Sequence, residues 1–137
     1  MTPESSHIDQ LLEEARSRLP HRPTAEELPA LRARGALIVD IRPVELRSGD
    51  GELPGAVVVD RNVLEWRLDP TSPHRIPEAD SPDREIVLVC DEGYASSLAA
   101  ATLQTLGLTR ATDLAGGFQA ILRHEAPRDA GNAPGNG

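Results

Sequence analysis

Cys90 is the residue with the clearest potential for chemistry, because it is the only cysteine in 137 residues and it ends a short apolar run. A small glycine-containing segment separates it from an alanine- and leucine-rich stretch. This order of strand, cysteine, tight loop and helix predicts a thiol that faces backbone N–H groups at a helix N-terminus. Those groups favour the thiolate, which is the nucleophilic form of cysteine. The residues of the candidate active-site loop are Asp91, Glu92, Gly93, Tyr94, Ala95 and Ser96.

A structural role is the alternative for Cys90, because free cysteine is among the most buried residue types in proteins. A cysteine that only fills a core needs no tight turn directly after it, whereas open α/β sheets bind ligands at the carboxyl ends of their strands. The glycine and serine in the following segment therefore favour a reactive cysteine.

The elements around Cys90 follow an alternating order of strands and helices, which predicts an α/β fold with a mainly parallel central sheet. Continuous apolar runs are typical of buried parallel strands, and apolar residues at helical spacing are typical of amphipathic helices. The expected strands lie at residues 36–41, 56–59, 86–89 and near 112–114. The expected helices lie at residues 8–19, 24–35, 62–68, 97–106 and 118–124. Residues 42–55, rich in glycine and proline, are expected to form a polar loop.

The composition argues against several classes of partner and cofactor. A formal net charge of -8 opposes binding to nucleic acid and to anionic membrane surfaces. No cluster of Cys and His has the spacing of a metal site, so neither a metal nor another cofactor is expected. No apolar run reaches the length of a membrane span, and the N-terminus lacks the pattern of a secretory leader. We therefore expect a cytoplasmic protein whose thiol stays reduced.

Several segments resemble the motifs of a known family, the single-domain rhodanese-like sulfurtransferases. Residues 39–42, Val-Asp-Ile-Arg, resemble its first-strand Asp-x-Arg signature, and residues 52–56, Glu-Leu-Pro-Gly-Ala, resemble its Gly-His-Ile-Pro-Gly-Ala segment. Residues 114–118, Leu-Ala-Gly-Gly-Phe, resemble its closing Leu-x-Gly-Gly-Phe, and Cys90 stands where the family has its nucleophile. The ordered set is far more specific than any single motif. The resemblance implies a rhodanese-like three-layer fold with helices on both faces of the sheet.

The resemblance also implies a reaction. In the family, the cysteine takes a sulfane sulfur from a donor such as thiosulfate, becomes a persulfide and passes the sulfur to a thiophilic acceptor. Cys90 would carry the sulfur, and the N–H groups from Glu92 to Ser96 would stabilise the thiolate and the persulfide. Ser96 is expected to cap the following helix, and Gly93 to supply backbone geometry that a side chain would resist. The partners implied are a small-molecule sulfur donor and acceptor, or a protein or low-molecular-weight thiol.

The sequence departs from the family where the substrate is chosen. Thiosulfate-active loops often place arginine directly after the cysteine and arginine, threonine or serine at the sixth loop position, where this chain has Asp91 and Ala95. The carboxylates of Asp91 and Glu92 would repel the thiosulfate dianion, so its use as donor stays open. Compensating cations are predicted at the same edge of the sheet, because Arg42 and Arg61 each follow a strand.

The roles of these charged residues have structural alternatives. Arg42 could instead pair with a structural carboxylate such as Asp40 or Glu45, and Arg61 could be solvated. Asp40 is expected to support the fold or the loop. We expect an N-terminal helical extension at residues 1–35, a rhodanese-like domain at 36–126 and a disordered tail at 127–137.

Two other functions compete with sulfur transfer. One is a non-catalytic rhodanese-like module that serves as a protein-interaction surface. The other is a cysteine-dependent phosphatase or arsenate reductase, whose anion loop resembles Cys, five residues and an arginine. Here Ser96 occupies the position of that arginine, and no arginine lies between Arg84 and Arg110, which disfavours the phosphatase. The oligomeric state and the physiological donor and acceptor are left open by the sequence.

Overall fold

The structure, a computed structural model, describes residues 5–125 and contains a four-stranded parallel sheet. The strands lie in the order β2-β1-β3-β4. Their bounds are β1 Leu37–Asp40, β2 Val57–Val58, β3 Ile86–Val89 and β4 Ala111–Asp113. Asp40 stands opposite Val89 in the register of β1 and β3, so both strands end at the same level. The parallel sheet predicted from the apolar runs is confirmed.

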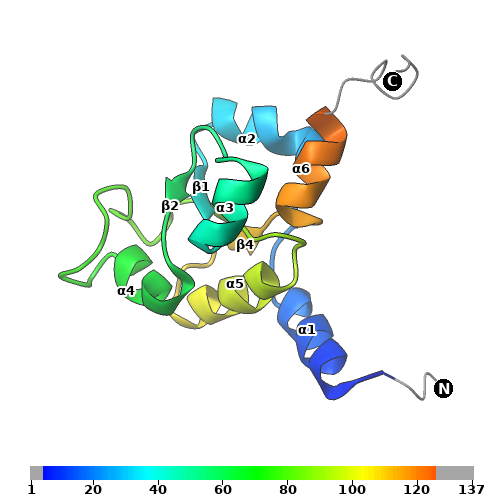
Figure 1. The fold of residues 1–137 in the computed structure, drawn as a ribbon. Coiled ribbons are helices and arrows are strands. Elements are labelled where there is room, and N and C mark those ends of the chain that lie inside the picture. The colour runs from blue at the N-terminus through cyan, green and yellow to red at the C-terminus, as the bar shows by residue number, and fades with distance from the viewer. Residues whose placement is uncertain (1–4, 126–137) are drawn as a thin grey trace, which may run out of the picture.

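Helices cover both faces of this sheet (Figure 1). Helices α2 and α6 lie over one face, and α4 and α5 lie over the other. The resulting three layers confirm the predicted fold class. The helical segments are α1 His7–Ser17, η1 Ala25–Glu27, α2 Leu28–Ala33, α3 Val44–Asp50, η2 Arg61–Val63, α4 Leu64–Leu68, α5 Ala95–Thr105 and α6 Gly117–Glu125.

The two faces of β3 show why a continuous apolar run forms its centre. Ile86 and Leu88 pack in the cluster shared with α5, while Val87 and Val89 pack in the cluster shared with α6. Both faces are buried, and each fully buried aliphatic side chain contributes about 1.5–3 kcal/mol. Side chains alternate along a strand, so Cys90 continues the first set and points toward α5.

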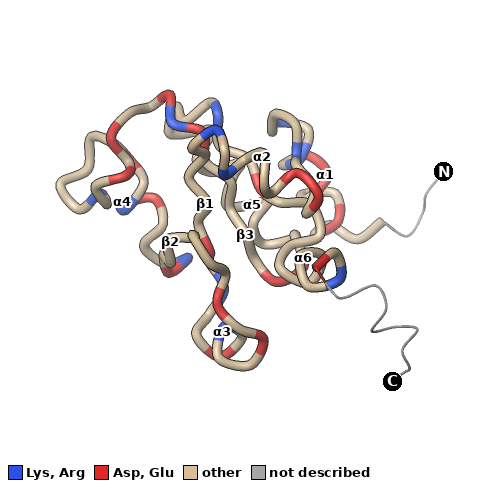
Figure 2. The backbone as a smooth tube through the Cα atoms, turned by 90° about the horizontal axis from the view of Figure 1, so that it is seen from above, with Lys and Arg blue, Asp and Glu red and all other residues tan. Residues whose placement is uncertain are grey.

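Helix α3 lies in the segment that the sequence analysis expected to be a polar loop, so that part of the prediction is wrong. Pro43 is its N-cap and has extended backbone angles. None of the seven helical residues is buried, and their sequence, Val-Glu-Leu-Arg-Ser-Gly-Asp, is too short and polar to show the apolar spacing that indicates a helix. Figure 2 shows α3 beyond the carboxyl end of β1. The predicted disordered tail lies outside the described residues.

Helix α1 packs against α5 and leads into a segment that runs beside β4. Ser6 caps α1 by accepting a hydrogen bond from the N–H of Asp9 at 3.1 Å. Beyond the helix, the N–H of Ala115 donates to the carbonyl of Pro23 at 2.8 Å. The N-terminal segment is therefore attached to the sheet as well as to α5. None of the helices between residues 5 and 125 has the length and apolar character needed to cross a bilayer.

Candidate active site

The sulfur of Cys90 lies in a cradle of backbone amides at the start of α5. The N–H of Gly93 donates to Sγ at 3.2 Å, and the N–H of Ser96 donates to it at 3.3 Å. Within residues 5–125 these are the two amides that bond to the sulfur, a narrower set than the expected run from Glu92 to Ser96. Cys90 is 7% exposed, so the sulfur is shielded but reachable from one side. Amides aimed at a sulfur stabilise negative charge on it.

Gly93 fits this loop because its backbone requires a residue without a side chain. Its φ of 87° lies in the left-handed region, as the sequence analysis expected for this position. A Cβ at Gly93 would also stand 2.8 Å from the backbone nitrogen of Gly116. The loop is thus packed directly against the turn that precedes α6.

The start of α6 holds the carbonyl groups of the same loop. The N–H of Phe118 donates to the carbonyl of Cys90 at 2.8 Å, and the N–H of Gln119 donates to that of Asp91 at 3.0 Å. Gly117 allows this approach, because a Cβ there would stand 2.6 Å from the Cys90 carbonyl oxygen. The amides of the loop are left free to face the sulfur.

Ser96 does not cap α5, and that prediction is wrong. The N-cap is Tyr94, and Ser96 is a buried residue of the first helical turn. Its hydroxyl donates to Oδ2 of Asp113 at 2.6 Å, and its oxygen accepts from the Cys90 thiol at 3.2 Å. Asp113 is fully buried at the end of β4 and was missed from the sequence. The available signal was a carboxylate within the short strand expected near residues 112–114.

A pocket of about 380 Å³ opens in front of the sulfur. Its walls combine apolar side chains with two arginines and two carboxylates. The lining residues are Ile41, Arg42, Pro43, Leu46, Arg61, Cys90, Asp91, Glu92, Tyr94 and Ala95. The structure therefore brings Arg42 and Arg61 to the loop, at the edge of the sheet where they were expected.

The contacts of Arg42 are those of a residue that supports the fold. It is 2% exposed and pairs with both carboxylate oxygens of Asp40, the closest contact being 2.7 Å. It also donates to the carbonyl of Gly51 at 2.9 Å, and its guanidinium lies 3.7 Å from the centre of the Phe118 ring. Asp40 and Arg42 thus hold the connection after β1, so the charge of Arg42 is largely balanced within the protein.

The remaining charges of the pocket lie near its mouth. Arg61 is paired with Glu65 at 3.0 Å, and its side chain is 40% exposed. Asp91 accepts a hydrogen bond from Gln119 at 2.9 Å, whereas Glu92 is exposed. The mouth therefore has one partly paired cation and two carboxylates, which is the acidic environment expected from the sequence. No three His, Cys, Asp or Glu side chains come together as a metal-ligand set in the described part of the chain.

Comparison with known proteins agrees with this fold and site. The Rhodanese-like domain family matches residues 24–124, and the chain therefore belongs to the rhodanese-like family of sulfurtransferases. Thiosulfate sulfurtransferase GlpE of Stutzerimonas stutzeri is 34% identical over 104 residues, which cover 76% of this chain and 85% of that protein.

Two solved structures extend the similarity. A protein of unknown function from Rhodopseudomonas palustris, described as a possible tyrosine phosphatase, is 33% identical with a TM-score of 0.77. That similarity covers 93% of this chain and 97% of the other. The human single-domain sulfurtransferase TSTD1 is 26% identical with a TM-score of 0.62, over 77% of this chain and 97% of the other.

Proposed function

We propose that the protein transfers sulfane sulfur through a persulfide on Cys90. The observation that carries the proposal is the pair of amides from Gly93 and Ser96 that face the sulfur at the base of the pocket. This arrangement stabilises a thiolate before transfer, and its N–H groups lie near the place where the outer sulfur of a persulfide carries charge. The free Cys90 thiol must stay clear of stable disulfides between transfers, which fits the cytoplasm, where we place the protein.

The reaction balances as two displacements at sulfur. The Cys90 thiolate attacks the sulfane sulfur of the donor, a Cys–S–S bond forms, and the donor's bond to that sulfur breaks. Sulfite leaves with the electron pair if the donor is thiosulfate, and a thiolate leaves if the donor is a persulfide. The acceptor, a thiolate or cyanide, then attacks the outer sulfur and releases the Cys90 thiolate. Splitting the transfer in this way gives ping-pong kinetics.

Charge at the pocket mouth favours a persulfide donor over thiosulfate. Glu92 is exposed beside the loop and Asp91 lines the same pocket, whereas Arg61 already has a carboxylate partner. A dianion must approach against two negative charges, while a neutral or cationic thiol persulfide does not. The name of the relative from Stutzerimonas stutzeri, a thiosulfate sulfurtransferase, supports thiosulfate as a donor as well. The charge argument alone makes it the weaker of the two.

The test is the intact mass of the purified protein after incubation with thiosulfate or with a low-molecular-weight thiol persulfide. We expect a gain of one sulfur atom that a reductant reverses, and Cys90→Ser should show none. The persulfide should load the protein faster than thiosulfate does. No gain with either donor would overturn the proposal and favour an interaction module.

The substitution Glu92→Gln tests the assignment of donor class. Removing one exposed charge at the mouth should lower KM for thiosulfate about 2- to 5-fold, because such a charge contributes about 0.5–1 kcal/mol in a water-like dielectric. The rate with a neutral persulfide should change little. Equal effects on both donors would show that charge repulsion does not select the substrate.

Phosphatase activity is the alternative suggested by the description of the Rhodopseudomonas palustris protein. The position that would need an arginine clamp holds Ser96, which is buried and committed to Asp113. Arg42 is poorly suited to replace the clamp, because Nε and Nη2 of its guanidinium are held by Asp40, whose charge balances its own. We expect no turnover of a chromogenic aryl phosphate, and turnover that is lost in Cys90→Ala would contradict this view.

A further inference from the structure

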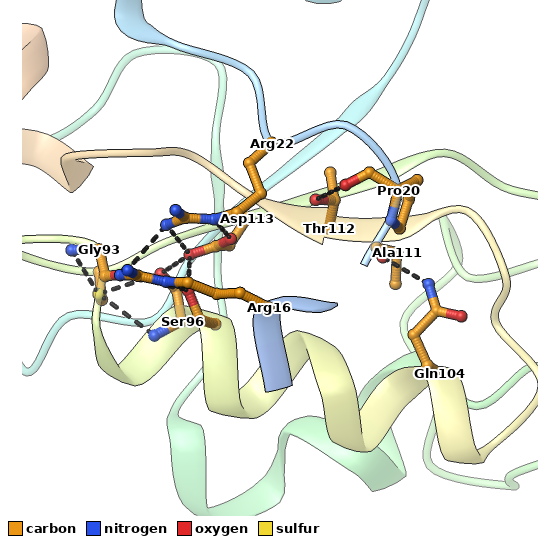
Figure 3. Close-up of polar contacts among 11 residues, drawn as sticks. Arg16, Pro20, Arg22, Gly93, Ser96, Gln104, Ala111, Thr112 and Asp113 are labelled. Carbon is orange, nitrogen blue, oxygen red and sulfur yellow. Dashed lines mark hydrogen bonds and ion pairs between the residues drawn. The ribbon is translucent and has the colours of Figure 1, made fainter. Parts of the chain in front are cut away.

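Two arginines from the N-terminal segment reach the active-site loop. Arg16 of α1 donates from Nη2 to the carbonyl of Gly93 at 2.8 Å, and Arg22 donates from Nη2 to the same oxygen at 3.2 Å (Figure 3). Gly93 is the residue whose N–H faces the Cys90 sulfur. Both arginines precede residue 24, where the family match begins. They therefore lie outside the part of the chain that the family model matches.

The same arginines are linked to the carboxylate of Asp113, Arg22 directly and Arg16 through Ser97. Arg22 pairs with Asp113 through Nε at 2.7 Å and Nη2 at 3.2 Å. Ser97 donates to Oδ2 of Asp113 at 2.8 Å and accepts from Nε of Arg16 at 3.0 Å. Asp113 is fully buried, and the side chain of Arg22 is 21% exposed. These charge-assisted hydrogen bonds hold the buried carboxylate in one orientation.

Counting protons shows how Asp113 acts on Cys90. The hydroxyl of Ser96 has one proton, and the 2.6 Å contact commits it to Asp113. The oxygen of Ser96 then faces the sulfur with a lone pair, which accepts the thiol proton at 3.2 Å. This contact favours the neutral thiol, whereas the two amides favour the thiolate. The charge behind Ser96 thus bears on the balance between the two forms.

We propose that Arg16 and Arg22 are positioning residues that set the ionisation of Cys90, by fixing Gly93 and by balancing the charge of Asp113 behind Ser96. Neither arginine touches the sulfur. Their role in sulfur transfer rests on the proposed function, because only that function requires a thiolate. The effect on ionisation itself does not depend on it.

The other charged groups near Cys90 are unchanged in variants of Arg16, Arg22 or Asp113. The pocket side of the sulfur faces Asp91 and Glu92 of the loop, Tyr94 at the rim, Arg42 after β1 and Arg61 after β2. The α5 and β4 side contributes Asp113, Arg22 and Arg16 through the contacts above. On the α5 and β4 side, a substitution of Asp113 therefore removes one negative charge, and a substitution of Arg22 or Arg16 removes one positive charge.

The experiment measures the rate of Cys90 alkylation by iodoacetamide against pH in the full chain. Asp113→Asn should move the pH of half-maximal rate down by about one unit, because a buried negative charge is lost. Arg22→Gln should move it up by about one unit, since Asp113 then lacks its cation. Arg16→Gln should move it up by less. A purely structural role would move all three variants in one direction, toward the value of an unfolded cysteine.

Arg18→Gln is the matched control, because Arg18 joins the same segment to α5 without reaching the loop. It donates to Oγ1 of Thr105 at 2.8 Å. Its alkylation profile should equal that of the wild type, and thermal unfolding should show that every variant folds. Should Asp113→Asn or Arg22→Gln fail to fold, Arg16→Gln against Arg18→Gln decides alone. Equal profiles for this pair would overturn the inference, and so would a shift of folded Asp113→Asn in the same direction as the two arginine variants.

The readout separates this inference from the proposed function, because alkylation requires no sulfur donor. Opposite shifts without any persulfide formation would leave the inference standing and overturn sulfur transfer. Persulfide formation with unshifted profiles would do the reverse.

Discussion

Single glycines decide whether the active-site loop can close around its sulfur. Gly93 and Gly117 both have positive φ, and both lie where a side chain would meet backbone atoms of the neighbouring segment. The obstruction at Gly117 is the more severe, since three backbone atoms of Cys90 and Asp91 would lie within 2.7 Å of a Cβ. The loop geometry therefore depends on the missing Cβ atoms of these two glycines as much as on the N–H groups that face the sulfur.

Gly117→Ala should destabilise the protein by at least about 2 kcal/mol, because left-handed backbone costs an alanine about 1–2 kcal/mol before the clash is added. Urea unfolding measures this change. Gly49→Ala is the matched control, because Gly49 lies in α3 with nothing near its Cβ position. That control should be neutral or slightly stabilising. Equal stabilities of the two variants would contradict the argument.

The residues of the site differ in how far the sequence could predict them. Cys90 and Gly93 were predictable, because a local order of strand, loop and helix already fixes where the thiol and the amides lie. Asp113 was not, since it meets Ser96 across 17 residues through the pairing of β4 with β3. The contact of Arg16 with Gly93 joins residues 77 positions apart. No local pattern encodes such a contact, because it depends on how α1 packs against α5.

At the scale of elements, the turn after β1 is held by the buried pair of Asp40 and Arg42. Both side chains are fully buried, and the pair ties the end of the strand to the carbonyl of Gly51 beyond α3. The sequence signature of these two residues predicted their importance. It did not predict α3 itself, whose short exposed helix has no apolar periodicity and follows a proline. Strands buried on both faces were easier to predict, since their runs are continuous.

Arg42→Met should cost about 3–5 kcal/mol in the free energy of unfolding, because Asp40 is then left as a buried charge without its partner. Guanidinium or urea unfolding at neutral pH measures the loss. Glu52→Gln removes the carboxylate of the more exposed pair with Arg47 and serves as control, with an expected loss below about 1 kcal/mol. A similar loss in both variants would show that burial does not strengthen the first effect.

At the scale of the whole molecule, charge is abundant and mostly at the surface. Figure 2 shows acidic residues and arginines interspersed along the loops and helices. One local network lies at the amino ends of β3 and β4, whereas Cys90 follows the carboxyl end of β3. There Glu85 receives hydrogen bonds from Arg34 at 3.0 and 2.7 Å and lies 3.6 Å from Arg110. It joins the end of α2 to the strands β3 and β4.

Glu85 gives this network a defined pH dependence. Hydrogen bonding from Arg34 holds the pKa of Glu85 below its usual value, against the opposing effect of burial. A carboxylate whose pKa is lowered by folding stabilises the protein above its unfolded-state pKa, and this contribution is lost as the pH falls through the folded value. Glu85→Gln should therefore unfold at lower urea than the wild type at pH 7, and the difference should close below about pH 4.

The control for this prediction is Glu78→Gln, which removes an exposed carboxylate outside the network. Its urea midpoint should follow the wild type at both pH values. A difference between wild type and Glu85→Gln that persists at low pH would show that packing, not charge, accounts for the loss.

The hydrogen bonds at the start of α6 hold two carbonyl groups of the loop away from the Cys90 sulfur. Since the carbonyls of Cys90 and Asp91 are both engaged by amides of α6, neither oxygen can turn toward the sulfur without breaking a bond. The peptide groups are thereby prevented from presenting an electronegative atom to whatever Cys90 carries. In the proposed transfer, negative charge moves between the Cys90 sulfur and the outer sulfur of the persulfide. These hydrogen bonds let that happen without a rearrangement of the main chain between turnovers.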